Sequence, residues 1–271
     1  ELIVYNKKSS HKGVIAHIKF ILKLRKNRFT HSFHLKRFFR NGFISFLSGI
    51  PNRLGFETEG KAPFLTKTIG YRNDQNIVLT NMSLLSLLGT DVPVNIKYIF
   101  YSSEKNASDA MKFVSDNGLR QRRFVIIHCG GESFGNTDLS VKIYSGLVSH
   151  LWNTMGIETV LICGPGDEHA VKGVRNKIGE SNHCYVHNSD CILVTAELMK
   201  LAGYFTGNNS GHSHLAALVG LPETVIYFKE DDQELLIEKW LPWQKNCGYV
   251  IIDTDVDIDK TVKNIGKNIT L

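Results

Sequence analysis

The stretch YFTGNNSGHSHLAALVGLPETVIYF, residues 204–228, most constrains what this chain can fold into. A β-type run, 204–206, stops at Gly207, and a polar loop then opens directly into the apolar helical pattern 215–219. A second β-type run, 224–228, follows the Gly-Leu-Pro break. This order predicts strand, loop, helix and strand, with free N–H groups at the start of the helix. Such a helix end is a natural seat for a phosphate or diphosphate.

The loop residues fit two interpretations. The N–H groups of Ser210 and Gly211, with the Ser210 hydroxyl, are candidates to bind a phosphate. Asn and Ser are also preferred N-cap residues, so an ordinary helix cap would give the same pattern. His212 and His214 fall in the first turn beside this loop, where either could contact a ligand or pack as a structural residue.

The same alternation runs through the chain from residue 124 onward. The strand-type runs are 124–129, 159–163, 184–186, 204–206, 224–228 and 249–252, with helical patterns between most of them. This order predicts a parallel, doubly wound α/β sheet, in which ligands bind beyond the carboxyl ends of the strands. Three glycine-rich loops follow such strands: Gly130-Gly131, Gly164-Pro165-Gly166 and residues 207–211. We expect these loops to converge on one crevice.

The N-terminal part is α/β in pattern as well. Strands are expected at 2–5, 32–35 and 96–101, and after the turn that starts at Ile50. A basic helix, 14–28, carries an apolar stripe that we expect to pack on the N-terminal sheet, with an anionic membrane surface as the alternative. Residues 118–123 have the character of a linker, which predicts two domains, 1–119 and 120–271.

Charge divides the chain in a similar place. Residues 1–123 carry 21 Lys and Arg against 8 Asp and Glu, a balance of +13, and the remainder carries 11 against 18, a balance of −7. The basic half would attract phosphate-rich material such as nucleic acid, an anionic lipid surface or a charged glycan, or it is a solvated surface.

Composition excludes several classes of protein. With 42% hydrophobic and 21% charged residues the chain is typical of a globular protein, and no apolar run is long enough for a membrane helix. The five cysteines lack the C-x-x-C spacing of a zinc site, and no disulfide framework or signal peptide is indicated. A reducing cytosol is the simplest location.

With these pieces in order, the chain resembles glycosyltransferase family 9, the bacterial heptosyltransferases. Residues 209–215 (NSGHSHL) resemble the family's Asp-Ser/Thr-Gly-x-x-His-Leu, and 48–56 (SGIPNRLGF) resemble its Ala-Gly-Ile-Pro-x-Arg-Ile-Gly-Phe. Residues 164–168 (GPGDE) fit the family's Gly-x-x-x-Glu, and 84–89 fit the helix that follows the second motif.

The chain also departs from the family pattern. Asn209 stands where the family has an acid, and the region 128–140 keeps a glycine but lacks the family's Lys and Trp-Pro. Lys229, at the same expected sheet edge, could replace that lysine or be a solvated side chain.

The resemblance leaves the catalytic residue of this chain unknown. In the family a first strand, a Gly-Asp loop and an aspartate that acts as the base precede the segment that matches here. The family's base would therefore lie upstream of Glu1, and the catalytic residue is left unknown.

The resemblance implies a GT-B fold: two Rossmann-like domains with parallel sheets, the N-terminal one lacking its first strands. It implies inverting, metal-independent sugar transfer, of heptose or a similar sugar, without a cofactor. The donor is a nucleotide-diphosphate sugar and the acceptor a lipopolysaccharide core or related anionic glycan, with no role for nucleic acid. The reaction would be cytoplasmic, at the inner face of the inner membrane, with peripheral contact to the membrane surface. The implied donor-binding residues are Gly130, Gly131, Ser133, Thr137, Gly164, Glu168, Asn209, Ser210, Gly211 and His214.

The sequence also suggests three alternatives to this interpretation. A family member that binds a nucleotide-sugar without catalysis would explain Asn209 and the absent lysine. Glu168, implied to bind ribose hydroxyls, could instead be a first-turn acid favoured by the helix dipole. A dinucleotide-dependent oxidoreductase shares the alternating pattern, but no G-x-G-x-x-G follows any strand here.

Overall fold

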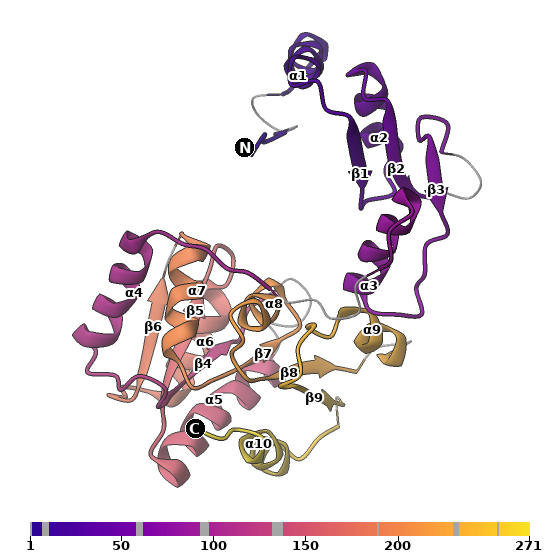
Figure 1. The fold of residues 1–271 in the computed structure, drawn as a ribbon. Coiled ribbons are helices and arrows are strands. Elements are labelled where there is room, and N and C mark those ends of the chain that lie inside the picture. The colour runs from indigo at the N-terminus through magenta and orange to yellow at the C-terminus, as the bar shows by residue number, and fades with distance from the viewer. Residues whose placement is uncertain are drawn as a thin grey trace. The chain divides into compact units, whose positions relative to one another are not determined.

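The computed structural model describes residues 2–6, 11–57, 62–92, 98–131, 138–188, 190–229, 233–253 and 255–271. The chain divides into two compact units, residues 1–96 and 97–271. Each unit is α/β and contains a parallel sheet (Figure 1). None of the helices in the described part of the chain has the length and apolar character that crossing a bilayer requires.

The first unit is built on a three-stranded sheet in the order β1-β2-β3. Its elements are α1 (Val14–Lys26), β1 (His31–His34), α2 (Phe39–Leu47), β2 (Asn52–Phe56), β3 (Lys67–Ile69), α3 (Ile77–Met82) and the 3-10 helix η1 (Ser83–Leu88). Leu54 and Phe56 of β2 and Leu84 of η1 are buried. The Arg53 guanidinium donates to the carbonyl oxygens of Ile50 and Phe64, which ties the turn before β2 to the segment before β3.

Two expectations for the first unit are wrong. Residues 2–6 form no strand; the Tyr5 hydroxyl instead lies 2.6 Å from His17 Nε2, and its ring lies 4.9 Å from that of Phe20. The apolar stripe of α1, which was expected to pack on the N-terminal sheet, is largely exposed: Ile18 and Leu22 are each 51% exposed. Phe20 is the buried residue of this helix. Aromatic contacts thus hold the start of the described chain on α1.

The second unit contains a six-stranded parallel sheet in the order β6-β5-β4-β7-β8-β9. Its strands are β4 (Phe124–His128), β5 (Glu158–Cys163), β6 (Cys184–Asn188), β7 (Tyr204–Asn208), β8 (Glu223–Phe228) and β9 (Cys247–Ile252). Its helices are α4 (Glu104–Asp116), α5 (Asp138–Met155), α6 (Glu168–Ile178), α7 (Ile192–Leu201), α8 (Gly211–Leu218), α9 (Gln233–Trp240) and α10 (Ile258–Lys267). The doubly wound sheet predicted from residue 124 onward is confirmed.

Helices cover both faces of this sheet (Figure 1). Val125 and Ile127 of β4 pack on the face covered by α5, α6 and α10, and Phe124 and Ile126 pack on the face covered by α4, α7 and α8. Successive side chains of a strand point to opposite faces, so a strand covered on both sides must be apolar throughout. This explains the continuous apolar runs in the sequence.

The segment before β4 belongs to the second unit. Helix α4 packs on α7, and residues 98–103, expected in part as a strand, have no regular structure. Phe100 packs against the core on the α7 face, and the Ser102 hydroxyl donates to the Glu197 carboxylate of α7. This segment therefore runs along α7 and does not join a sheet.

The last described residue lies at the amino edge of the second sheet. Leu271 packs against the core beneath α5 and α10, and its carbonyl oxygen lies 3.5 Å from Arg123 Nη1, just before β4. A Cβ added to Gly203, just before β7, would lie 2.4 Å from Leu271 Cδ2. Leu271 is thus packed beside the starts of the two central strands.

Glu223, the first residue of β8, is a buried carboxyl group whose hydrogen bonds do not offset the cost of its burial. It is 0% exposed; Gln244 Nε2 donates to its Oε1 at 2.5 Å, and its Oε2 has no hydrogen-bond partner among the described residues. Burial raises the pKa of Glu223 from 4.5 to about 8, against the hydrogen bonds from Gln244 and Cys247, which lower it. The folded protein therefore keeps a proton here that the unfolded chain releases.

We expect stability to fall with rising pH between 4.5 and about 8 because of Glu223. The decline should reach up to about 1.4 kcal/mol per pH unit and be absent from Glu223→Gln, because glutamine carries no proton to lose. Urea unfolding at several pH values across this range measures the decline in both proteins. Glu180→Gln, at an exposed position, is the matched control and should follow wild type. Parallel profiles for Glu223→Gln and wild type would contradict the prediction.

Candidate functional site

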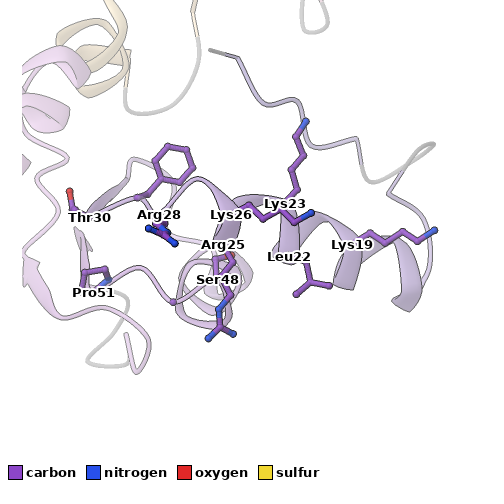
Figure 2. A pocket seen from close by; sticks show the side chains of 11 residues that line it. Lys19, Leu22, Lys23, Arg25, Lys26, Arg28, Thr30, Ser48 and Pro51 are labelled. Carbon is purple, nitrogen blue, oxygen red and sulfur yellow. The ribbon is translucent and has the colours of Figure 1, made fainter.

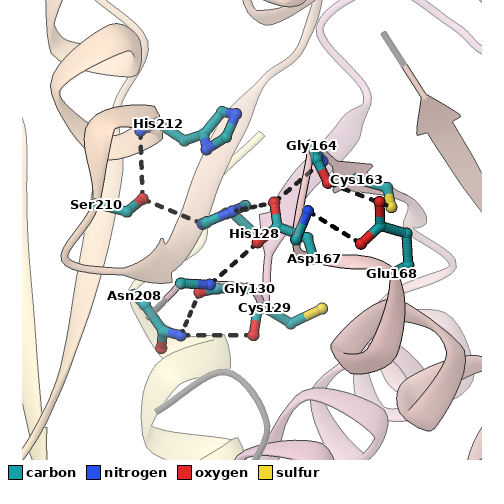
Figure 3. Close-up of polar contacts among 12 residues, drawn as sticks. His128, Cys129, Gly130, Cys163, Gly164, Asp167, Glu168, Asn208, Ser210 and His212 are labelled. Carbon is teal, nitrogen blue, oxygen red and sulfur yellow. Dashed lines mark hydrogen bonds and ion pairs between the residues drawn. The ribbon is translucent and has the colours of Figure 1, made fainter. Parts of the chain in front are cut away.

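The carboxyl ends of three adjacent strands form the candidate site. β4 ends at His128, β5 at Cys163 and β7 at Asn208, and the register pairs His128 with Gly207. Because all three strands are parallel, the loops that follow them emerge at the same sheet edge, as Figure 3 shows. The predicted convergence of the three glycine-rich loops is therefore seen in the fold.

A buried carboxylate joins these loops. Asp167, the N-cap residue of α6, is 8% exposed. Its Oδ2 accepts from His128 Nε2 at 3.1 Å and from the Gly164 N–H at 3.0 Å, and its Oδ1 accepts from the Gly131 N–H at 3.1 Å (Figure 3). One side chain thus links the end of β4 to the loop after β5.

This carboxylate is ionised at neutral pH. Burial raises the pKa of Asp167, but the hydrogen bonds from His128 and from the Gly164 N–H lower it by more, so this pKa lies below its usual range. Burying a charge is tolerated only where hydrogen bonds compensate it, and three donors do so here. Asp167 is therefore a fixed negative charge behind the loops.

His128 extends the chain of hydrogen bonds to α8. Its imidazole is 2% exposed, and its Nδ1 lies 3.1 Å from Ser210 Oγ. Ser210 caps α8: its Oγ accepts the His212 N–H at 3.2 Å, and the Ser213 hydroxyl donates to its carbonyl oxygen at 2.8 Å. The ordinary-cap interpretation of Ser210 is correct, and it adds a hydrogen bond to His128 that the sequence did not indicate.

The start of α8 leaves one N–H group available. The Ser210 N–H lies 3.4 Å from Ser213 Oγ, and the N–H groups of Ser213 and His214 donate to the Ser210 carbonyl. No described residue accepts the N–H of Gly211, which follows the cap and is exposed. Of the two predicted backbone donors, Gly211 is therefore the one free to meet a ligand.

His212 lies over His128, with ring centroids 4.1 Å apart. Burial and the neighbouring His128 lower the pKa of His212 to about 4, although Asp167 acts in the other direction. Burial also lowers the pKa of His214. Both imidazoles are neutral at physiological pH, so they offer one N–H each and no positive charge.

A second buried bond fixes the loop after β4. Asn208, 7% exposed, donates through Nδ2 to the Gly130 carbonyl at 2.8 Å, and its Oδ1 accepts from the Tyr144 hydroxyl at 2.5 Å. Tyr144 lies on α5 and is fully buried. The first glycine of this loop is therefore held from both sides, by Asn208 and by the neighbourhood of Asp167.

The other predicted residues fall in different places. Ser133 and Thr137 lie outside the described residues. Asn209 is exposed, and Glu168 begins α6, where its Oε2 accepts the Gly166 N–H at 3.0 Å. Lys229 is exposed and pairs with Asp253 at 2.5 Å. Among the described residues no group of three or more His, Cys, Asp or Glu is arranged to hold a metal ion.

The catalytic base expected upstream of Glu1 stays a prediction. Glu1 itself lies outside the described residues, so the structure places neither it nor anything before it. Within the candidate site the carboxylate of Asp167 is 8% exposed and accepts three hydrogen bonds from within the protein, so its observed contacts are structural. The catalytic residue is therefore still unassigned.

Sequence reasoning gave no role to four residues at this edge: His128, Asp167, Asn208 and Tyr144. Two of them carried a usable signal, because His128 ends an otherwise apolar strand and Asp167 starts a helix after the next strand. The rule that parallel strand ends share one edge would have placed them together.

The first unit carries a separate, basic hollow of about 950 Å³. It lies between α1, the segment after it and the turn 48–51 (Figure 2). Of its eleven lining residues five are basic and none is acidic; the basic ones are Lys19, Lys23, Arg25, Lys26 and Arg28. This hollow is suited to an anionic ligand.

The family model of glycosyltransferase family 9 (heptosyltransferase) matches residues 17–267. The chain belongs to this family. The recognition made from the sequence motifs is thus confirmed, and with it the assignment as a glycosyltransferase. No curated protein matches the chain.

Solved structures of family 9 share its fold. A family 9 glycosyltransferase from Veillonella parvula is 18% identical with a TM-score of 0.78, covering 98% of this chain and 75% of that one. The ADP-heptose lipopolysaccharide heptosyltransferase II of E. coli is 17% identical with a TM-score of 0.73, over 93% and 80%. The E. coli heptosyltransferase WaaC with ADP is 15% identical with a TM-score of 0.70, over 94% and 78%. This likeness confirms the predicted GT-B fold.

Gly130 provides a test of how rigidly this family 9 site is built. A Cβ added there would lie 1.9 Å from Asp167 Oδ1, and Asp167 cannot move without loosening its three hydrogen bonds. We expect Gly130→Ala to lower the free energy of unfolding by about 2 kcal/mol, as overpacked sites do.

Denaturant unfolding measures this loss. Gly211→Ala is the matched control, because a Cβ at Gly211 meets nothing within 4 Å, and its stability should equal that of wild type or exceed it slightly. If Gly130→Ala were as stable as Gly211→Ala, Asp167 would not be held as described.

Proposed function

We propose that this protein transfers a sugar from a nucleotide-diphosphate donor to a lipopolysaccharide core or related anionic glycan, with inversion and without a metal ion. The observation that carries the proposal is the family 9 match combined with an anion-binding geometry at the carboxyl edge of the second sheet. In doubly wound sheets this edge is where nucleotides bind.

The donor diphosphate is placed at the start of α8. The free N–H of Gly211 and the positive end of the helix favour negative charge at this point. The loops that contain Gly130-Gly131 and Gly164 flank this seat at the same edge, and His214 lies in the first turn. As the bond to the sugar breaks, the same groups stabilise the charge on the departing diphosphate.

The nucleoside is placed toward β5 and β6. A hollow of about 680 Å³ opens beside α6, lined by the Gly164-Pro165 turn, Glu168, Lys172 and Arg175 among others. Glu168 already accepts an N–H from Gly166, and its carboxylate has capacity to accept ribose hydroxyls as well. The similar structure of WaaC contains ADP, which makes ADP the first ligand to test.

The acceptor is placed on the basic first unit. Its hollow carries five basic side chains and suits the phosphates or carboxylates of an anionic glycan. A glycolipid acceptor would bring the protein to a membrane surface, and the balance of +13 over residues 1–123 would favour contact with anionic lipids. The group that takes the acceptor proton is not assigned to a residue of this chain.

Asn209 supports a second candidate function, nucleotide-sugar binding without transfer. It occupies the position of the family's acid, and an amide cannot take up a proton. Thermal shift with a panel of nucleotide-sugars identifies ligands, because a ligand that binds only the folded state raises the melting temperature. Incubation of the best ligand with deacylated lipopolysaccharide core then separates the two functions, since only the enzyme forms a glycosylated product.

A charge substitution tests the diphosphate seat. Gly211→Asp places a carboxylate where the phosphates are proposed to bind, while an acid in the first turn is favourable for the helix itself. We expect wild-type stability and at least about tenfold weaker binding of ADP, equivalent to about 1.4 kcal/mol.

Isothermal titration calorimetry with ADP measures this effect. Asn264→Asp, an exposed position on α10, adds the same charge away from the sheet edge and should bind like wild type. Unchanged affinity in Gly211→Asp would remove the phosphate seat from α8.

A further inference from the structure

Asp167, His128 and Ser210 form a continuous line of hydrogen bonds that ends beside the proposed diphosphate seat. Asp167 Oδ2 and Ser210 Oγ each lie 3.1 Å from a ring nitrogen of His128, on opposite sides of the imidazole (Figure 3). The three residues come from different segments, and His128 is 2% exposed. Water therefore has little access to the imidazole in this line.

The hydrogen positions in this line follow from the chemistry of its two ends. An ionised carboxylate only accepts hydrogen bonds, so His128 Nε2 must carry a hydrogen directed at Asp167. In a neutral imidazole the other nitrogen is then an acceptor, and the Ser210 hydroxyl donates to Nδ1. The Ser210 hydrogen is in that case unavailable to a ligand.

Protonation of His128 reverses the second bond. Both ring nitrogens then donate, and Ser210 Oγ accepts from His128 Nδ1 as well as from the His212 N–H. The Ser210 hydroxyl hydrogen becomes free to turn toward the crevice. An anion at the start of α8 gains a hydrogen bond and a nearby positive charge only in this protonated arrangement.

We propose that Asp167 and His128 are positioning residues that switch the Ser210 hydroxyl toward the donor diphosphate, so that donor binding is coupled to uptake of one proton by His128. This inference rests on the proposed function and adds a mechanism to it. In the free protein the hydroxyl points at His128, and in the complex it points at a phosphate oxygen.

The charged and titratable groups around His128 are compatible with this switch. Asp167 lies on one side and balances the charge of the imidazolium. His212 of α8 lies over the ring and stays neutral, because its pKa is lowered to about 4. His214 of α8 also has a lowered pKa through burial, and burial raises the pKa of the thiols of Cys129 and Cys163.

Two further acids lie at this edge: the Glu168 carboxylate accepts the Gly166 N–H, and Asp190 follows β6 and lines the hollow beside α6. Tyr144 of α5 stays a neutral phenol, since burial raises its pKa well above the usual value. Among the neighbours named here, His128 alone contacts both Asp167 and Ser210, and a histidine can donate from both ring nitrogens once it is protonated.

Proton-coupled binding has a measurable signature. Affinity for a diphosphate should fall as pH rises, by up to about tenfold per pH unit, because binding takes up one proton. ADP-ribose is the suitable probe, because its diphosphate diester keeps the same charge across this pH range and does not itself bind or release protons.

The experiment is calorimetric titration of the full chain with ADP-ribose at about pH 6 and about pH 8, each in two buffers with different heats of ionisation. We expect tighter binding at the lower pH and a buffer-dependent heat that reports proton uptake. His128→Gln keeps a donor for Asp167 but cannot be protonated, so its affinity should not change with pH. His212→Gln is the matched control and should retain the proton uptake of wild type.

A second measurement does not depend on how the variants fold. The imidazole signals of His128, followed by NMR in the wild-type protein near neutral pH, should move toward those of an imidazolium when ADP-ribose is added. In Asp167→Asn this change should be smaller, because the negative charge that balances the imidazolium is gone.

Each remaining outcome overturns a definite statement. ADP-ribose binding with equal affinity at both pH values and no proton uptake would overturn the switch and leave the proposed function standing. Proton uptake that persists in His128→Gln would assign the proton to another group. Labelling of Ser210 by a fluorophosphonate would show a nucleophile where we propose a positioned donor. Absence of binding of both ADP-ribose and ADP would overturn the proposed function as well.

Discussion

The carboxyl edge of the second sheet depends on one buried negative charge. Asp167 accepts hydrogen bonds from the loop after β4, from the loop after β5 and from His128, which in turn contacts the cap of α8. A carboxylate buried without such donors would cost several kcal/mol. The three donors make the charge tolerable, and in return the charge fixes the relative positions of three loops. A ligand that binds at this edge meets a surface already set by internal electrostatics.

Much of the second unit could be predicted from the sequence, because each strand is an apolar run covered on both faces. The motif around Ser210 also placed the helix start within one residue. The bond between His128 and Asp167 could not be predicted in this way, since it joins residues 39 positions apart and depends on which way two side chains turn. The prediction of a strand at 2–5 was wrong for a related reason: the Tyr5 ring packs against His17 and Phe20 of α1, a contact between distant side chains that the local pattern does not indicate.

The structure gives a different reason for the glycines of the site from the one expected. From the sequence, Gly130 was expected to let a ligand approach the backbone. In the structure a side chain there would collide with Asp167, and a Cβ at Gly207 would lie 2.5 Å from the His128 carbonyl oxygen. These glycines are thus required by the protein's own packing between β4, β7 and α6. Any contact they make with a donor comes in addition to that requirement.

The packing of Leu271 has a practical consequence for how this protein is handled. Its carbonyl contacts Arg123, and its side chain reaches Gly203, so it lies where β4 and β7 begin. Ser210 and Asp167 lie where those parallel strands and β5 end, at the opposite edge of the sheet. A biotin or fluorophore attached to a cysteine introduced at the exposed Arg123 would therefore lie at the edge of the second sheet away from the nucleotide side. Such a label leaves the loops that contain Gly130, Gly164 and Gly211 chemically unchanged.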